Sequence, residues 1–339
     1  MPITDINPYN TSYIPEPRAH HNETTLDNLL TQYFGTKTAV VSSARAGIHL
    51  ILSQLGLTKQ DHILIPDFLC RSVLYILNLQ GFAVQQADAR TKAIFVLHQW
   101  GYPQRMDIIM AEAKKRGWFV IEDCAHTFGG TYHGQILGSF GDASVISIPK
   151  FFPTYVGGAI ISQRDDMITR VCKMRRDPRS LGHFAFDRIS VWAARQFYLL
   201  RNPPFLFNAI CIKCVSFPRI PTIALRRFPR TVEDLKTVIA RRRYIFETLK
   251  KQASPNYYPD HLEEGSDVIP LCMPIFFPEA KLSVAQEMLK KKNIKVDILH
   301  FDVNRNVLDP RYIKCLAFPC HQYVTEEELH HMCDVIRHA

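Results

Sequence analysis

One lysine follows an apolar run in the middle of the chain. Residues 143–150 read ASVISIPK, and Lys150 is the only lysine between Lys115 and Lys173. An amine in apolar surroundings has its charged form disfavoured, so it becomes nucleophilic near neutral pH. Lys150 is therefore a candidate for binding an aldehyde covalently as a Schiff base.

A carboxylate and a turn of small residues also follow apolar, strand-like runs elsewhere in the sequence. Asp123 ends the apolar run WFVIEDC (118–124), where a buried carboxylate needs a partner. It either caps the following segment or pairs with a protonated heterocyclic nitrogen. Ser43, Ala44 and Arg45 open a helical pattern and would offer N–H groups, a hydroxyl and a guanidinium to a phosphate, although serine is also a common N-cap.

These three features together indicate a cofactor. A covalent lysine, a carboxylate for a ring nitrogen and a phosphate cradle are what a protein supplies to pyridoxal 5′-phosphate. The lysine would hold the aldehyde, and the carboxylate would keep the pyridine nitrogen protonated so that the ring acts as an electron sink. The sequence thus predicts a pyridoxal-phosphate site.

The elements around these residues alternate between strand and helix. Apolar runs of strand length alternate with helical periodicity up to about residue 165, which predicts an α/β fold with a mixed, mostly parallel sheet. The expected strands are 38–43, 62–67, 82–88, 93–100, 118–124, 142–150 and 157–163, and the expected helices are 44–57, 70–81 and 106–117. Ligands of such sheets bind at the carboxyl ends of the strands, where the candidate residues stand.

The pattern changes after residue 165. We expect an N-terminal arm (1–23), a large cofactor-binding domain (24–165), a basic, aromatic-rich helical insertion (166–230) and a small C-terminal α+β domain (231–339). The last would contain a long charged helix (231–252), strands at 268–277, 294–299 and 313–320, and helices at 280–293 and 325–339. Thr325 and Glu328 would form a capping box.

Composition limits the class of protein. The 339 residues are 47% hydrophobic and 22% charged, as in globular proteins, and no apolar run reaches the length of a spanning helix. The N-terminus lacks a signal-peptide pattern, which favours the cytoplasm. Nine irregularly spaced cysteines argue against a disulfide framework, and the single C-x-x-C at Cys211 and Cys214 lacks a second pair, so we expect no metal site.

The net charge of +9 is concentrated in one region. Thirteen Lys and Arg residues lie between Arg170 and Arg230, interleaved with aromatic side chains. The plainer interpretation is an insertion with solvated arginines. The sharper one is peripheral contact with an anionic membrane, at its inner face, or with an acidic substrate. No nucleic-acid-binding module accompanies the charge, so we expect no nucleic-acid partner.

Three stretches resemble the DegT/DnrJ/StrS-type aminotransferases, which have the aspartate aminotransferase fold (fold type I). They are VSSARAG (41–47), IEDCAHTFGG with GQILGSFGD (121–142), and LAFPCHQYVTEEEL (316–329). The resemblance implies roles for eight residues. Lys150 would form the Schiff base, Asp123 would bind the pyridine nitrogen, and His126 would lie near the ring hydroxyl. The phosphate would be bound by Ser147 together with Ser43, Ala44 and Arg45. Cys70 would lie on the ring face, where many members place an aromatic residue, with Phe68 or Trp100 as alternatives.

The resemblance also implies a reaction, although the sequence departs from the family pattern at several positions. The expected function is transfer of an amino group, from glutamate, to a nucleotide-linked keto sugar by a homodimer. The compact S-x-x-K from Ser147 to Lys150, followed by Gly157–Gly158, resembles a subset of the family. Related dehydratases have histidine at the lysine position, so Lys150 argues against dehydration. The family's G-x-N-x-R signature has no clear counterpart, which leaves a second hypothesis: a catalytically altered or non-enzymatic protein that binds a membrane or a partner.

Overall fold

The computed structural model describes residues 22–154, 156–175, 219–220, 225–254, 258–259 and 262–338. The predicted N-terminal arm up to residue 21, the Cys211–Cys214 pair, and most of the predicted basic insertion with its proposed membrane contact lie outside these residues. Within the described part of the chain, no helix is both long and apolar enough to cross a bilayer.

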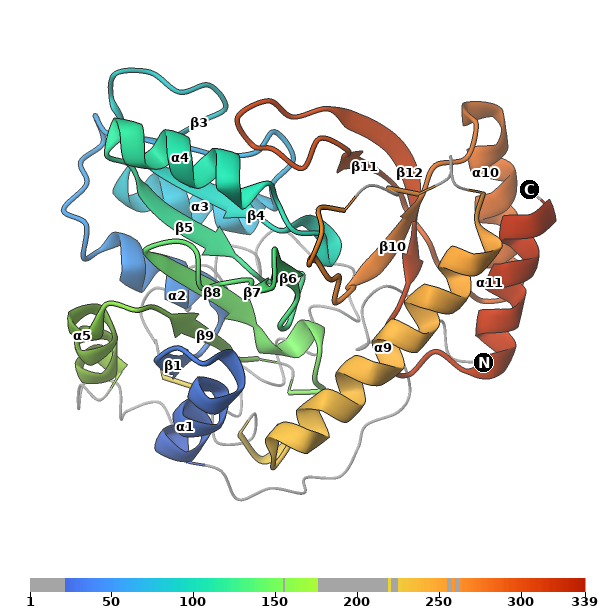
Figure 1. Cartoon of the computed structure of the whole chain (residues 1–339), viewed down its shortest axis with the longest axis horizontal. Coiled ribbons are helices and arrows are strands. Elements are labelled where there is room, and N and C mark those ends of the chain that lie inside the picture. The colour runs from blue at the N-terminus through green and yellow to red at the C-terminus, as the bar shows by residue number, and fades with distance from the viewer. Residues whose placement is uncertain are drawn as a thin grey trace.

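A seven-stranded sheet forms the centre of the fold (Figure 1). Its order is β1-β9-β8-β5-β4-β2-β3, and only β9 runs against its neighbours. The bounds are β1 Thr38–Val41, β2 His62–Leu64, β3 Phe82–Val84, β4 Thr91–Leu97, β5 Phe119–Asp123, β8 Ala143–Ser147 and β9 Gly158–Ile161. The predicted α/β fold with a mixed, mostly parallel sheet is confirmed.

Helices cover both faces of this sheet. One face packs on α2 (Ala44–Leu52), α3 (Arg71–Gln80) and α5 (Asp165–Arg175), and the other on α1 (Glu23–Phe34) and α4 (Met106–Arg116). Neighbouring residues of a strand enter opposite cores, as Ile94 and Phe95 of β4 do. This alternation explains why the strands read as continuous apolar runs.

A second, three-stranded sheet follows in the sequence. Its order is β10-β12-β11, and it packs with three helices; we call this assembly the C-terminal subdomain. The bounds are β10 Cys272–Ile275, β11 Ile298–Asp302, β12 Tyr312–Pro319, α9 Val232–Gln252, α10 Glu279–Lys290 and α11 Glu326–His338. The predicted capping box is present, because Thr325 Oγ1 accepts from the Glu328 N–H and the Glu328 carboxylate accepts from the Thr325 N–H. The exact domain boundaries remain a prediction.

Two local predictions differ from the structure. The strand expected at 294–299 begins only at Ile298, because Asn293 has a left-handed backbone (φ 60°) and pairing with β12 starts at Ile298–Leu316. Helix α1, within the segment that follows the predicted arm, was not predicted from the sequence. It begins at the Asn22 side chain, which accepts from the Thr25 N–H, and it buries Leu26, Leu29, Leu30 and Phe34. A short hairpin, β6 (Thr131–Tyr132) and β7 (Gln135–Ile136), was also missed.

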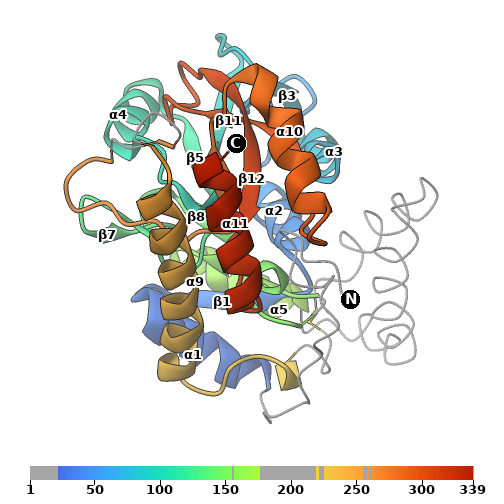
Figure 2. The ribbon, with the colours of Figure 1, turned by 90° about the vertical axis from the view of Figure 1, so that its right-hand side faces the viewer.

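Helix α9 joins the two sheets. It runs diagonally from α1 beside the large sheet to the C-terminal subdomain (Figure 1), where it lies next to α11 in both views (Figure 2). The chain leaving β8 turns toward the middle of α9, which brings the segment around Lys150 against the C-terminal subdomain.

Candidate active site

The candidate residues gather at one edge of the large sheet. Asp123 ends β5, Ser147 ends β8, and Lys150 ends the 3₁₀ helix η3 (Ile148–Lys150) that follows. Ser43 and Cys70 stand after β1 and β2, directly before α2 and α3. Because these strands run in one direction, their carboxyl ends meet, as expected for a ligand site in such a sheet.

Lys150 lies within electrostatic reach of several of these residues. Burial lowers the pKa of its ammonium group, while Asp123 and Cys70 raise it and Arg45 lowers it further. The net shift is downward, which increases the fraction of neutral, nucleophilic amine at a given pH. The structure therefore brings Lys150, Asp123, Cys70 and Arg45 together.

Asp123 is a buried carboxylate with one oxygen already engaged. Its side chain is 3% exposed, and Oδ1 accepts from the Ala125 N–H at 2.8 Å. Burial raises the pKa of this carboxyl, which Lys150 and the Ala125 hydrogen bond partly offset. Within the described residues, no protein donor bonds to Oδ2, so this oxygen can accept from a ligand. Both sequence interpretations, cap and heterocycle partner, are compatible with this arrangement.

His126 accepts a hydrogen bond from a residue with an unusual backbone conformation. Its Nδ1 accepts from the N–H of Trp100 at 3.2 Å, and Trp100 has a left-handed backbone (φ 54°), which is rare for an aromatic residue. Burial, with a smaller effect of Lys150, holds the pKa of His126 well below its usual value. The imidazole is therefore neutral and carries its proton on Nε2.

The side chains suggested for the ring face lie in different surroundings. Trp100 is 5% exposed, and its ring packs on Phe301 with centroids 5.4 Å apart, so its place on the ring face stays a prediction. The Phe68 ring stacks on His300, with centroids 4.6 Å apart. Cys70 is exposed, its sulfur lies 3.1 Å from Ser72 Oγ, and it lies within electrostatic reach of Lys150.

A glycine pair shapes the space between β8 and α2. Gly158 pairs with Ser147 on one side and Val41 on the other, and Gly157 bridges Ser43. A Cβ on Gly158 would lie 2.4 Å from Ala44 N and 2.5 Å from the Ser43 carbonyl carbon. The pair thus allows β9 to pass against the N-terminus of α2, which the Ser43 hydroxyl caps through the Ala46 N–H. Ser43 and Ser147 flank one cradle, and a helix N-terminus opens into it.

The sequence interpretation missed the role of Glu122. This carboxylate is fully buried and accepts from the N–H groups of Gly138, Phe140 and Gly141, and it lies 3.1 Å from His98 Nε2. His98 Nδ1 in turn accepts from the Gln104 N–H. Cys124 lies close to both residues, and the three side chains could in principle ligate a metal. However, the carboxylate oxygens of Glu122 and both ring nitrogens of His98 are occupied by these hydrogen bonds, so the cluster holds the glycine-rich loop at residues 138–141 rather than a metal.

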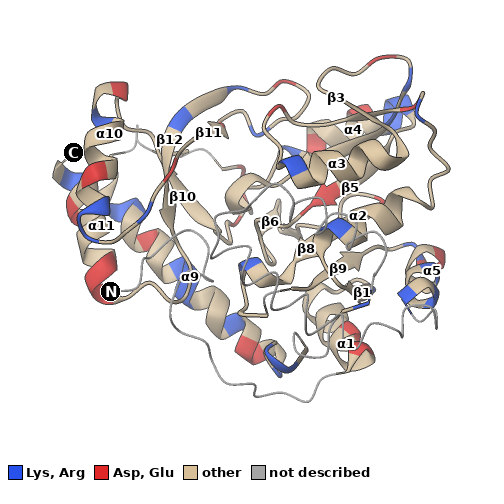
Figure 3. Cartoon of the chain, turned by 180° about the vertical axis from the view of Figure 1, so that it is seen from behind, with Lys and Arg blue, Asp and Glu red and all other residues tan. Residues whose placement is uncertain are grey.

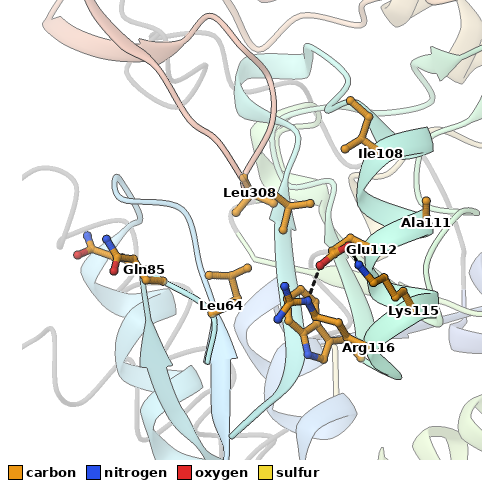
Figure 4. A pocket seen from close by; sticks show the side chains of 12 residues that line it. Leu64, Gln85, Ile108, Ala111, Glu112, Lys115, Arg116 and Leu308 are labelled. Carbon is orange, nitrogen blue, oxygen red and sulfur yellow. Dashed lines mark hydrogen bonds and ion pairs between the residues drawn. The ribbon is translucent and has the colours of Figure 1, made fainter. Parts of the chain in front are cut away.

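A cavity of about 680 Å³ lies elsewhere, beside α4 (Figure 4). Leu64, Trp118 and Leu308 supply apolar walls, and Glu112, Lys115 and Arg116 stand at its α4 side. None of the predicted site residues lines this cavity, so it is separate from the cluster around Lys150.

Known proteins resemble both the sequence and the fold. Residues 19–185 match the model of the DegT/DnrJ/EryC1/StrS aminotransferase family. The GDP-perosamine synthase of Escherichia coli O157:H7 is 30% identical over 150 residues, which cover 38% of this chain and 41% of that enzyme.

Solved structures share the fold over nearly the whole chain. A DegT/DnrJ/EryC1/StrS aminotransferase from Brucella abortus superposes with a TM-score of 0.68 and 16% identity, covering 93% of this chain and 89% of that one. The aminotransferase TlmJ from Streptoalloteichus hindustanus gives a TM-score of 0.69 and 16% identity, covering 95% and 91%. Over residues 19–185 the chain is thus similar to the DegT/DnrJ/EryC1/StrS aminotransferases, whose members depend on pyridoxal phosphate, and it shares the fold of solved members over nearly its whole length.

Proposed function

We propose that this protein transfers an amino group from glutamate to a nucleotide-linked keto sugar. The observation that carries the proposal is the meeting of Lys150, Asp123 and the N-terminus of α2 at one sheet edge. The choice of acceptor is supported by the similarity to a GDP-perosamine synthase.

The residues present fit pyridoxal phosphate. The cradle between Ser43 and Ser147, where Gly158 allows β9 to pass against the N-terminus of α2, would accept the phosphate, with the Arg45 guanidinium as an additional donor. Asp123 Oδ2 would accept a hydrogen bond from the protonated pyridine nitrogen. His126 would donate from Nε2 toward the ring hydroxyl, because its Nδ1 is occupied by Trp100. Ala44 would contribute its N–H to the phosphate, and Cys70 would lie on one face of the ring.

Among the residues of this chain, Lys150 would take part directly in the reaction. When bound, pyridoxal phosphate supplies an electron sink that stabilises negative charge on the neighbouring carbon of the substrate. Lys150 Nζ would hold the aldehyde between turnovers. Once displaced by the amino donor, the same amine would remove a proton from one carbon and return it to another, which its lowered pKa favours.

The proposal is tested by the two half-reactions. Protein loaded with pyridoxal phosphate should convert glutamate to one equivalent of 2-oxoglutarate, and then aminate a keto sugar from a panel of nucleoside-diphosphate-linked sugars. Lys150→Ala should abolish both steps. Asp123→Asn should slow both by roughly 100-fold, because a neutral amide does not hold the ring nitrogen protonated. Failure of the fully loaded wild type with every donor and acceptor would refute the assignment.

The family resemblance also supports a homodimer as part of this proposal. Light scattering on the purified protein should give twice the mass of one chain, whereas a monomer that is active in both half-reactions would contradict this part.

A further inference from the structure

Arg242 occupies a place where an apolar residue is expected. The buried face of α9 carries Leu235, Ile239, Phe246 and Leu249, and Arg242 continues this stripe at the spacing of a core position. Its side chain is completely buried. The arginines on either side differ: Arg241 pairs with Glu326, and Arg243 pairs with Asp267, both near the surface. Both basic and acidic residues occur along α9 (Figure 3).

The Arg242 guanidinium contacts the main chain at Lys150. Nη2 donates to the Lys150 carbonyl at 2.9 Å, and Nη1 donates to the Pro270 carbonyl at 3.1 Å. Nε donates to Gln322 Oε1 at 3.0 Å, and the guanidinium carbon lies 4.2 Å from the centroid of the Phe151 ring.

Gln322 extends this contact by one residue. Its amide nitrogen donates to the Phe151 carbonyl at 2.7 Å. The carbonyls of Lys150 and Phe151 are therefore both held by side chains of the C-terminal subdomain. Within the turn itself, the N–H groups of Phe151 and Phe152 both donate to the Ile148 carbonyl.

Stability alone is a poor reason to bury this cation. Among the described residues, no carboxylate pairs with Arg242, and burial lowers its pKa to about 9, so it remains charged at neutral pH. Buried charges are often replaced by apolar residues without loss of stability. Arg242 donates three hydrogen bonds to main-chain and amide oxygens, and one of these oxygens is the carbonyl of Lys150. This pattern indicates that Arg242 positions the main chain of the reactive lysine.

We propose that Arg242 and Gln322 are positioning residues that clamp the main chain of Lys150 to the C-terminal subdomain. The inference rests on the proposed function and deepens it. While Lys150 is joined to the cofactor, the covalent bond fixes its amine. While it transfers protons, only the main chain at η3 fixes it, so the clamp keeps Nζ at the reacting carbons.

Arg242→Met tests the clamp, and Arg241→Met on the same helix is the matched control. Arg242→Met removes all three hydrogen bonds but keeps an unbranched side chain of similar reach. We expect kcat to fall by about 100-fold with little change in KM, because misplacement of a reacting group by about 1 Å lowers the rate by this order. The pH midpoint of the visible absorption band of the loaded protein should also shift. Amide hydrogen exchange at Phe151 and Phe152 should become faster, with or without cofactor, and Arg241→Met should change none of these.

Gln322→Met provides a milder variant if Arg242→Met does not fold. It releases the Phe151 carbonyl and should give faster exchange at the same amides and a smaller loss of kcat. Unchanged kcat, midpoint and exchange in the folded variants would overturn the clamp, as would a loss of stability alone. If the wild type forms no visible band, the proposed function fails, whereas unchanged exchange at Phe151 and Phe152 would still refute the clamp and faster exchange would support it.

Discussion

Gly158 gives the sharpest test of the cradle geometry. Its Cα faces the first residues of α2, and an added Cβ would meet Ala44 N at 2.4 Å and the Ser43 carbonyl carbon at 2.5 Å. Because non-bonded heavy atoms approach to about 3.5 Å, Gly158→Ala must separate β9 from α2 by roughly 1 Å. Both contacts are to backbone atoms, so no side-chain rotation can relieve them.

The displacement should reduce both stability and cofactor affinity. Overpacking of this kind destabilises by about 1–3 kcal/mol. A shift of this size also takes an N–H of the α2 N-terminus out of hydrogen-bond distance of a bound phosphate. Loss of one hydrogen bond to a charged group, about 1.5–3 kcal/mol, weakens binding by roughly 10- to 100-fold. Urea unfolding measures the first effect, and titration with pyridoxal phosphate, followed by absorbance, measures the second.

Gly117→Ala serves as the control. Gly117 ends α4 with φ 67°, and a Cβ there would meet no atom within 4 Å. This variant should lose about 1 kcal/mol of unfolding free energy, because alanine is strained in a left-handed backbone, and it should bind the cofactor normally. If Gly158→Ala binds pyridoxal phosphate as tightly as the wild type, the phosphate does not lie in this cradle.

Two further predictions concern buried groups near the site. Glu122→Gln places an amide NH₂ among three N–H donors and should destabilise the protein by about 3 kcal/mol; a free energy of urea unfolding within 1 kcal/mol of the wild type would contradict the role assigned to this carboxylate. His126 is held neutral by burial and by Lys150, whereas in the unfolded chain it titrates near 6.5, so the native state loses stability as the pH falls below that value. His126→Gln should reduce the loss of unfolding free energy between pH 7.5 and pH 5.5 by about 1 kcal/mol in cofactor-free protein, and an unchanged loss would mean that His126 takes up a proton in the folded state.

The succession of strands and helices along the first half of the chain could be predicted from the sequence, because each strand is an apolar run and each helix has its own periodicity. The order of the strands within the sheet was not predicted. The carboxyl-edge rule then placed Asp123, Lys150 and the turn at Ser43 together without any structure. Helix α1 was missed because its signal is a cap at Asn22 and four apolar positions in an otherwise polar segment.

The missed residues depend on contacts between distant segments. Nothing local distinguishes Glu122 from Asp123, yet one holds the glycine-rich loop and the other faces Lys150. Arg242 sits within three consecutive arginines, and only its place on the apolar stripe of α9 separates it from its neighbours. That stripe was a usable signal. The left-handed backbone of Trp100 had no such signal, because the hydrogen bond from its N–H to His126 joins segments that are distant in the sequence.

The central claim is that Lys150 holds pyridoxal phosphate. The most direct measurement is reduction of the loaded protein with borohydride, followed by peptide mass spectrometry. We expect a phosphopyridoxyl group on Lys150 alone, a visible absorption band that reduction removes, and neither feature in Lys150→Ala. A label on another lysine, or a Lys150→Ala protein that keeps the band, would contradict it.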